Sequence, residues 1–453
     1  MKRLLLALGV LAALVPSAAA RGPEVNVSSL AGAQSEPTIT IDPVDDRILL
    51  AGSNSFSEGT MRAYSSTDGG ASWQASAVYP PPAKEGDVCA ADPGVGIDRN
   101  GRQYYSFVRS TPCNTGKPRL FVASRAGPGD PWETPVLVAP LAGARFDDKP
   151  AITVDRSPSS RYRNRVYVAW TRISHEGVFS ILVSSSDDGG KSWSPPRRAN
   201  SSGEELTYAT LATSRRGVLY VAWHDVSAFH LNIARSIDGG ASFGPEDQVA
   251  AFAIVTIPAC KAGIVIPAQK FTCTRPNPIV SVDTSTGPHA GRVYVSYTVI
   301  DFQGDKGVAV TVFDSRLRAL AGYPVRKDPL LVAPPRASAH VDQFWPASAV
   351  DPSTGTLWIC FYDTRGDPER RRAHFSCTVS RNGGTRWSPL FRAATVASDE
   401  TQAGADTREY GDYEGLTVAD GVAHPIWTDS RELATRAEEI YTTTLRTSDT
   451  PKR

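Results

Sequence analysis

The six residues Pro37-Thr-Ile-Thr-Ile-Asp42 combine a proline, four residues of alternating β-propensity and a closing aspartate. The pattern returns at Pro93–Asp98, Pro150–Asp155, Pro278–Asp283 and Pro346–Asp351, with weaker copies at Tyr208–Thr213 and Gly415–Asp420. The closing positions follow one another at steps of 56 to 70 residues. Seven copies at such regular spacing predict one large repeat fold rather than two or three ordinary domains.

A second apolar run, rich in aromatic residues, follows each copy. Examples are Arg165–Trp170, Val218–Trp223, Arg292–Tyr297 and Leu357–Tyr362. Composition and length make these runs β-strands, and the Asp and Gly residues before them mark tight hairpins. A third run such as Ile181–Ser186 and a weaker fourth complete each copy. Four short antiparallel strands per copy predict an all-β protein, a seven-bladed β-propeller.

The two ends of the chain bear on how this ring closes. The seventh copy has three strand-like runs and lacks a fourth, whereas Glu24–Ser28 precedes the first copy and resembles a strand without a blade. We expect this N-terminal strand to complete the last blade, which would remove two exposed sheet edges. The alternative is a frayed N-terminus.

Residues 1–20 resemble a secretory signal. Lys2 and Arg3 precede the apolar stretch Leu4–Val15, which is too short to span a bilayer, and Ser17–Ala20 supplies small residues for cleavage. We expect a mature chain of residues 21–453 forming a single propeller domain. The predicted location is extracellular or periplasmic, and no later stretch has the length of a membrane helix.

Six cysteines fall into three pairs that are close in sequence: Cys89 with Cys113, Cys260 with Cys273, and Cys360 with Cys377. An oxidising compartment favours disulfides, and we expect these local pairings among the 15 that are possible. The net charge of +1 gives no electrostatic reason to expect binding to nucleic acid or to an anionic membrane.

A tighter motif, Ser-x-Asp-x-Gly-x-x-Trp/Phe, lies between the third and fourth strands of several copies. It occurs at Ser66–Trp73, Ser186–Trp193 and Ser236–Phe243, and with Asn382 in place of the aspartate at Ser380–Trp387. Side-chain hydrogen bonds to nearby amides and glycines at positive φ explain these residues as a folded turn. The alternative, catalytic or metal-binding acids, is not needed to explain them.

Through these four motifs the chain resembles the Asp-box (BNR repeat) superfamily, which includes the sialidases. The resemblance implies a propeller, an extracellular protein and a glycan ligand. Two features depart from sialidases, which have six blades and begin with a Phe/Tyr-Arg-Ile-Pro motif whose arginine holds the substrate carboxylate. The matching region here, Glu36–Ile41, has no arginine.

One face of the propeller should carry the site, because loops before the first strand and after the second strand of every blade meet there. The residues before the repeated phrase form a predicted ring: Glu36, Asp92, Lys149, Thr207, Asn277, Trp345 and Glu414. Arginines that follow second strands could hold a carboxylate, and aromatic rings could stack on a sugar.

A sialidase-like mechanism, as the resemblance implies it, assigns roles on this face. Arg172, Arg365 and Arg431 would bind the substrate carboxylate, with Trp345 as a further substrate contact. Tyr413 would be the nucleophile, Glu205 its base, and Asp92 or Asp148 the acid. If two carboxylates do the work instead, Asp148 and Glu414 are the candidates. A structural alternative makes Asp363–Arg365 and Asp429–Arg431 local ion pairs.

The sequence requires no cofactor. The acid-rich loops Phe146–Lys149 and Gly411–Glu414 could bind Ca²⁺, although their spacing is not diagnostic. We therefore predict a secreted, sialidase-like glycoside hydrolase acting on sialylated or other acidic glycans, and expect a monomer. The alternatives are a non-catalytic propeller that binds glycan or protein, and a purely structural propeller.

Overall fold

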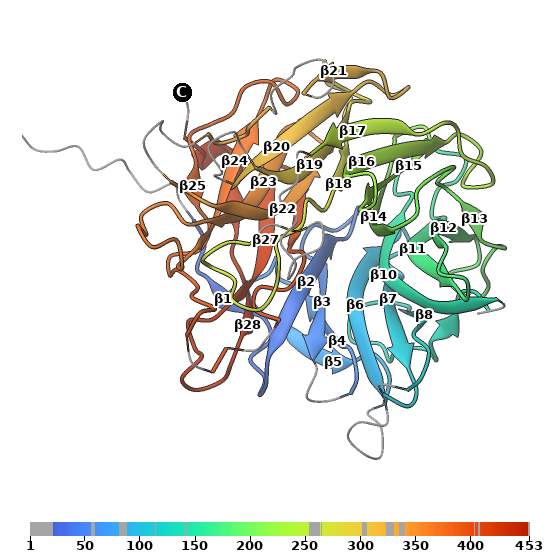
Figure 1. Ribbon diagram of the computed structural model, residues 1–453, viewed down its shortest axis with the longest axis horizontal. Coiled ribbons are helices and arrows are strands. Elements are labelled where there is room, and N and C mark those ends of the chain that lie inside the picture. Colours follow the sequence, from blue (N-terminus) through green and yellow to red (C-terminus); the bar gives the residue numbers. More distant parts are fainter. Residues whose placement is uncertain are drawn as a thin grey trace, which may run out of the picture.

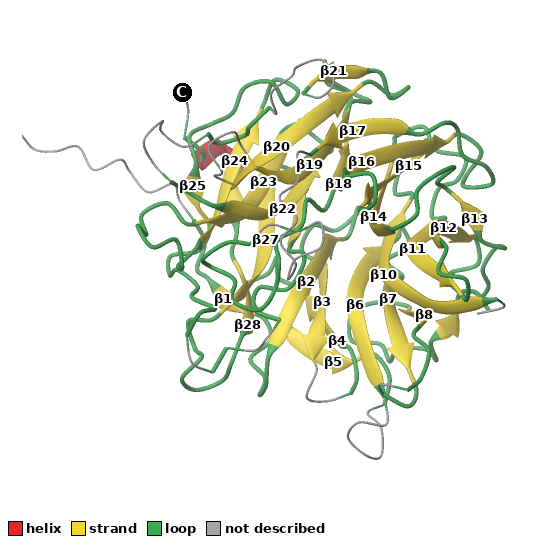
Figure 2. Ribbon diagram, viewed as in Figure 1, coloured by secondary structure: helices red, strands yellow, loops and turns green. Residues whose placement is uncertain are grey.

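The protein is a seven-bladed β-propeller, as the spacing of the repeats predicted. The computed structural model describes residues 21–451 except 56–58, 81–87, 114, 141–142, 253–262, 264, 301–305, 323–329, 335–339, 403 and 406–407. Seven antiparallel sheets surround a central axis, with the first strand of each sheet innermost (Figures 1 and 2). The expected signal segment, residues 1–20, lies outside the described residues.

The blades follow one another in chain order. Blade 1 contains β2 (Gln34–Ile41), β3 (Leu49–Ser55), β4 (Arg62–Ser66) and β5 (Gln74–Ala77); blade 2 contains β6 (Cys89–Ile97), β7 (Gln103–Ser110), β8 (Arg119–Arg125) and β9 (Val136–Leu137). Blade 3 contains β10 (Ala144–Val154), β11 (Val166–Ser174), β12 (Phe179–Ser186) and β13 (Arg197–Arg198); blade 4 contains β14 (Leu206–Thr213), β15 (Leu219–Asp225), β16 (His230–Ser236) and β17 (Asp247–Ala251). Blade 5 contains β18 (Ile279–Val282), β19 (Val293–Ile300), β20 (Lys306–Phe313) and β21 (Ala319–Ala321); blade 6 contains β22 (Gln343–Val350), β23 (Leu357–Asp363), β24 (His374–Ser380) and β25 (Phe391–Arg392).

Blade 7 is closed by the N-terminal strand. It contains β26 (Gly415–Ala419), β27 (Val422–Asp429), β28 (Glu439–Thr442) and, outermost, β1 (Val25–Asn26), while β29 (Leu445–Arg446) also pairs with β27. β1 runs antiparallel to β28, with Val25 opposite Thr442. The prediction that an N-terminal strand completes the last blade is therefore confirmed.

The hydrophobic core is divided among the seven interfaces between neighbouring blades. One cluster of buried side chains lies at each interface, including the seam between blades 7 and 1. The aromatic residues of the second strands supply the largest members, each adding about 1.5–3 kcal/mol through burial. Buried examples from blades 3 to 7 are Trp170, Trp223, Tyr297, Tyr362 and Trp427.

The four Ser-x-Asp/Asn-x-Gly motifs form one kind of turn, at the blade end opposite the start of the innermost strand. In the first, Ser66 Oγ donates to Asp68 Oδ1 (2.7 Å) and accepts from Gly70 N (2.8 Å). Asp68 Oδ1 also accepts from Ser72 N at 2.9 Å. The same bonds recur in the other three turns, with Asn382 as the acceptor in the last. Turn chemistry thus accounts for these residues.

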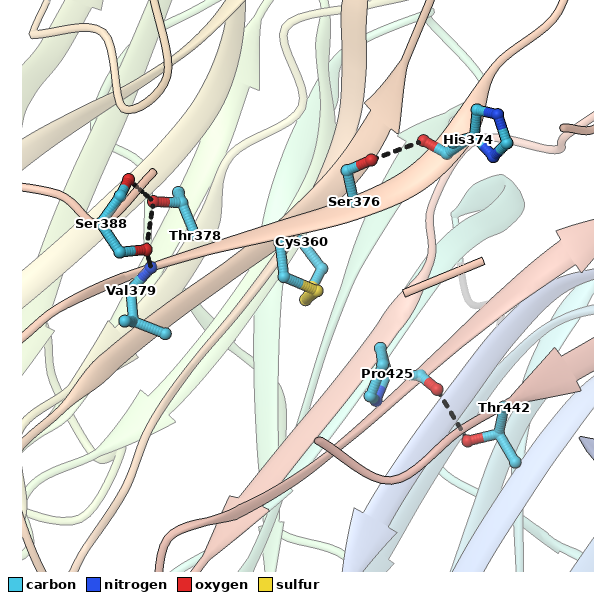
Figure 3. The surroundings of a disulfide bond; sticks show 9 residues. Cys360, His374, Ser376, Thr378, Val379, Ser388, Pro425 and Thr442 are labelled. Atoms are coloured by element: carbon cyan, nitrogen blue, oxygen red, sulfur yellow. Dashed lines mark hydrogen bonds between the residues drawn. A yellow bond between two sulfur atoms is a disulfide. The ribbon is translucent and has the colours of Figure 1, made fainter. Parts of the chain in front are cut away.

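Two of the expected disulfides, Cys89–Cys113 and Cys360–Cys377, are present. The second joins paired positions on the adjacent strands β23 and β24 (Figure 3). Cys273 is also disulfide-bonded, whereas Cys260, its expected partner, lies outside the described residues. Within the described part of the chain, no helix is long and apolar enough to cross a membrane.

Candidate functional site

The innermost strand begins with a strained backbone bulge in five of the seven blades. At each bulge the pairing with the second strand shifts register, and a non-glycine residue adopts positive φ. These residues are Glu36 (54°), Asp92 (60°), Lys149 (47°), Tyr208 (54°) and Trp345 (50°). Such conformations cost roughly 1–3 kcal/mol each and gather at functional sites, so this end of the axis is the candidate site.

Blade 4 corrects the predicted alignment by one residue. The alignment of the repeats predicted that Thr207 precedes the repeated phrase in blade 4 and that the phrase begins at Tyr208. The register shift between Thr207 and Thr210 shows that Tyr208 occupies the bulge position and that Ala209 stands where other blades have proline. The phrase therefore closes at Ser214, whose hydroxyl accepts from Val218 N at 3.0 Å.

Lys149 is the centre of a cluster of charged residues at this end of the axis. Its Nζ lies 3.0 Å from Asp92 Oδ1, 2.8 Å from Asp412 Oδ2 and 3.6 Å from Glu36 Oε1. We call these four residues, with Asp148, Tyr208 and Tyr413, the axial cluster. It joins blades 1, 2, 3, 4 and 7, so residues up to 376 positions apart in sequence meet.

Hydrogen bonds fix the carboxylates around Lys149. Asn54 Nδ2 donates to Glu36 Oε2 (2.6 Å), while its Oδ1 accepts from Asp92 N (3.1 Å). The second oxygen of Glu36 accepts from Asp412 N at 3.1 Å. The Tyr208 hydroxyl donates to Asp412 Oδ2. The side chains of Lys149 and Asp412 keep 17% and 19% exposure, so solvent reaches the cluster.

The carboxyl groups of the axial cluster have divergent acidities. Burial, reinforced by the charges of Asp412 and Asp92, raises the pKa of Glu36 to about 8 despite Lys149. Burial and the charge of Asp92 raise the pKa of Asp148 to about 6. Burial would raise the pKa of Asp412, but Lys149 and Tyr208 hold it below its usual value. Acids with separated pKa values are a feature of acid–base catalysis.

Tyr413 lies beside the same charges. Its ring centroid is 5.9 Å from Lys149 Nζ, and its buried hydroxyl has no hydrogen-bond partner among the described residues. Burial, followed by the charges of Glu36 and Asp92, raises the pKa of Tyr413 well above 10. Glu36 and Asp92 are thus the carboxyl groups whose charges act most strongly on Tyr413.

The remaining predicted acids have other surroundings. Glu414 is buried below the cluster, where Oε1 accepts from the Tyr362 hydroxyl (2.7 Å) and Oε2 from Thr428 N (3.1 Å). Burial raises the pKa of Glu414 well above its ordinary value. Glu205 precedes β14, and its carbonyl accepts from Val226 N at 2.8 Å.

The three arginines predicted to hold a carboxylate each pair with a carboxylate of the protein. Arg172 makes a bidentate pair with buried Asp147 (2.7 and 2.9 Å). Arg431 is bidentate to Asp429 and also lies 2.6 Å from Glu24. These contacts fit the structural alternative raised from the Asp-x-Arg pattern. Arg365, half-exposed, lies 3.4 Å from Asp363.

Trp345 adopts the bulge conformation but does not present its ring to the face. It is 1% exposed and packs in the core cluster between blades 6 and 7. A residue without a predicted role, Arg275, instead faces the axial cluster, where its charge acts on Asp412 and Tyr208. Trp345 is therefore not included in the candidate site.

Of the residues predicted for the site, Asp92, Asp148 and Tyr413 lie in the axial cluster, whereas Glu36, Lys149, Tyr208 and Asp412 were given no role in the reaction. The position directly before the repeated proline was the sequence signal that could have assigned Glu36 and Lys149 to the site. Phe146–Lys149 and Gly411–Glu414, the two loops considered for Ca²⁺, do meet, but through the Lys149 ammonium, which lies 2.8 Å from Asp412 Oδ2. Among the described residues, no group of three or more His, Cys, Asp or Glu side chains could hold a metal ion.

A polar channel of about 790 Å³ opens at the other end of the axis, lined by the innermost strands. Among the residues predicted for the site, Glu414 lines this channel. The axial cluster thus closes the top of a channel that is open at the opposite face.

Comparison with known proteins gives the fold. No family model and no curated protein matches the sequence. A protein of unknown function from Dyadobacter fermentans is similar in structure, with a TM-score of 0.50 and 12% identity over 93% of this chain and 97% of that chain. A Hadza microbial sialidase also has a TM-score of 0.50, with 13% identity over 89% of this chain and 74% of its own. A Trypanosoma rangeli sialidase has a TM-score of 0.47, with 12% identity over 78% of this chain and 56% of its own.

Proposed function

We propose that this chain is a secreted glycoside hydrolase whose reaction takes place at the axial cluster. The observation that carries the proposal is that Asp148 and Asp92 act on each other electrostatically beside the Lys149 ammonium, with Asp92 and Lys149 held on strained backbone. Secretion is supported by the signal-like residues 1–20 and by the disulfides, which form in oxidising compartments. A propeller fold shared with a sialidase is compatible with this activity but does not by itself assign it.

Each carboxyl has a role in the proposed reaction. Asp148, with its pKa raised to about 6, donates a proton to the glycosidic oxygen as the bond to the anomeric carbon breaks. Asp92 attacks the anomeric carbon, or takes the proton from a water that attacks it. Lys149 positions Asp92 through their 3.0 Å contact.

The substrate proposed from the sequence is a sialylated or other acidic glycan. Arg172 and Arg431 are engaged with carboxylates of the protein, and Lys149 already contacts three carboxyl groups. A substrate carboxylate would meet Arg275, whose charge acts on Asp412 and Tyr208. In a sialidase-type reaction, Tyr413 would attack the anomeric carbon and pass its proton to Asp92, while Asp148 protonates the departing glycosidic oxygen.

The experiment is a panel of fluorogenic glycosides, including a sialyl reporter, with the purified mature protein. Loss of a general acid lowers rates by about 10²–10⁴-fold, so Asp148→Asn should lower kcat at least 100-fold. Asp92→Asn should act similarly, while the exposed control Asp46→Asn should retain wild-type kcat. Tyr413→Phe separates the two mechanisms, because it abolishes a tyrosine-nucleophile reaction and spares a two-carboxyl reaction. Full activity in Asp148→Asn would refute the assignment.

A second candidate is a non-catalytic propeller that binds glycan or protein. It is favoured by the contacts that the axial cluster makes within itself: Lys149 contacts three carboxyl groups, and Asp412 accepts a hydrogen bond from Tyr208. Such a network could simply plug the channel. No cleavage across the panel, together with saturable binding on a glycan array, would support this candidate.

A further inference from the structure

The open mouth of the central channel carries three arginines on three consecutive blades. Arg99, Arg156 and Arg215 each follow the closing residue of the innermost strand in blades 2, 3 and 4, and all three line the channel. We call them the basic rim. They lie at the face opposite the axial cluster, so the proposed hydrolase site does not use them.

The acids and the hydroxyl next to these arginines are occupied by their own turns. Asp98 Oδ1 accepts from Asn100 N (2.8 Å), and its Oδ2 accepts from the Tyr104 hydroxyl (2.8 Å). Asp155 accepts from Ser157 N (3.1 Å) and from the Ser160 hydroxyl (2.5 Å). The closing residue before Arg215 is the uncharged Ser214. The hydrogen bonds of these neighbours therefore serve the hairpins, and within the described residues none of these bonds is to a rim guanidinium.

The contacts of the rim guanidiniums are to neutral acceptors. Arg156 Nη1 reaches from blade 3 to blade 1, where it donates to Ile41 O (3.0 Å) and lies 3.5 Å from Thr40 Oγ1. Arg99 Nη1 donates to Arg156 O at 3.4 Å. Arg215 is exposed, and its guanidinium has no hydrogen bond or ion pair within the described part of the chain. Burial, partly offset by the charge of Asp42, lowers the pKa of Arg156.

The acids that line the mouth lie on the other side. Asp42 and Asp46 belong to blade 1 and Asp420 to blade 7. Asp42 Oδ1 is engaged by Val44 N at 2.8 Å. The mouth is thus basic along blades 2–4 and acidic along blades 7 and 1, which would confine a bound anion to the basic side.

The channel walls behind the rim suit a sugar. Its volume of about 790 Å³ lies within the usual range for small-molecule sites, roughly 300–1,000 Å³. Hydroxyl-bearing residues from the innermost strands of blades 1, 3, 4, 5 and 6 line it: Thr38, Thr40, Thr153, Thr210, Ser281 and Ser348. Hydroxyls can both donate to and accept from the hydroxyl groups of a saccharide.

We propose that the channel mouth is a second binding site, for a small polyhydroxylated carboxylate of the uronic acid type. The carboxylate is held by the basic rim, with Arg156 as its central contact, and the hydroxyl groups of the ligand face the threonines and serines of the channel. Guanidinium and carboxylate match in geometry, and the hydrogen bonds of Arg156 within the described residues are to neutral oxygens. A ligand carboxylate would therefore add a direct ion pair to the charge interaction with Asp42.

The test is calorimetric titration of the whole mature protein with sodium glucuronate, at constant ionic strength. Saturable binding is expected, with glucose and sodium sulfate each at least tenfold weaker because one lacks the charge and the other the hydroxyls. Arg156→Ala should weaken glucuronate binding at least tenfold. The glucuronate affinity of Arg156→Lys should lie between those of the wild type and Arg156→Ala, since lysine keeps the charge but loses the planar set of donors.

Matched variants guard against misfolding and against binding at the wrong site. Arg215→Ala removes an exposed rim guanidinium and should also weaken binding, while Arg216→Ala, its neighbour outside the channel lining, should bind as wild type. Asp148→Asn, at the axial cluster, should bind glucuronate normally whether or not it retains hydrolase activity. The proposal is overturned if glucuronate does not saturate, if sulfate binds equally well, or if folded Arg156→Ala and Arg215→Ala bind as wild type.

Discussion

At the scale of single residues, Lys149 balances charges that would otherwise repel one another. Its Nζ lies within 3.6 Å of carboxylate oxygens from Glu36, Asp92 and Asp412. Removing one partner of a buried ion pair costs roughly 3–5 kcal/mol, because the other charge is left uncompensated. We expect Lys149→Met to lower the free energy of unfolding by about that amount at pH 7, as measured by urea denaturation.

An exposed ion pair provides the control for this variant. Arg318 is 77% exposed beside Asp314, so Arg318→Met should cost about 0–1 kcal/mol. The loss in Lys149→Met should also shrink at pH 5, where the carboxyls left behind bind protons more readily. Equal losses in the two variants would show that Lys149 does not hold the cluster together.

Glu36 makes stability depend on pH in a definite direction. Burial raises its pKa from 4.5 to about 8 in the folded protein. Between these values the unfolded chain has released a proton that the folded protein retains, so stability falls as the pH rises through this window. Each pH unit costs at most about 1.4 kcal/mol from this group. We expect Glu36→Gln to flatten the fall in urea midpoint between pH 5 and pH 8, whereas the exposed variant Glu369→Gln should follow the wild type.

The same residues show how far sequence reasoning could go. The spacing of the repeats predicted the number of blades. The position before each repeated proline located Glu36, Asp92 and Lys149, because the same backbone bulge recurs with the same local sequence pattern. The bulge position of Tyr208 was not predicted, because Ala209 replaces the proline in blade 4 and the alignment of the repeat was therefore shifted by one residue. The burial of Trp345 and the pairing of Arg172 with Asp147 depend on packing between strands, which no local pattern records.

At the scale of elements, the Ser-x-Asp/Asn-x-Gly turn is a hydrogen-bonded unit whose four copies differ at the acceptor position, which allows a test. Asp68 accepts from Ser72 N (2.9 Å) and from the Ser66 hydroxyl (2.7 Å), and Asn382 makes the equivalent bonds in the fourth turn. Asp68→Ala should therefore lower the free energy of unfolding by about 1–2 kcal/mol. Asp68→Asn should lower it less, because the amide oxygen can accept both hydrogen bonds. Urea denaturation of both variants checks this, and an equal loss would mean that charge rather than hydrogen bonding matters.

At the scale of the whole molecule, the ring depends on a short strand that joins the two ends of the chain. Val27 packs in the seam between blades 7 and 1, and its amide donates to Ile440 O at 2.7 Å. Glu24 adds an ion pair with Arg431 at 2.6 Å. A protein that begins at Ala33 would lose these contacts and expose the edge of β28, so we expect a clearly lower urea midpoint and concentration-dependent association through the open edge. Glu24→Gln is the matched control, because it removes the ion pair but keeps the strand. Arg431 retains its bidentate contact with Asp429, so the urea midpoint of Glu24→Gln should fall much less than that of the shortened protein. If the shortened protein unfolds at the wild-type midpoint and stays monomeric by size-exclusion chromatography, blade 7 holds the circle closed without β1.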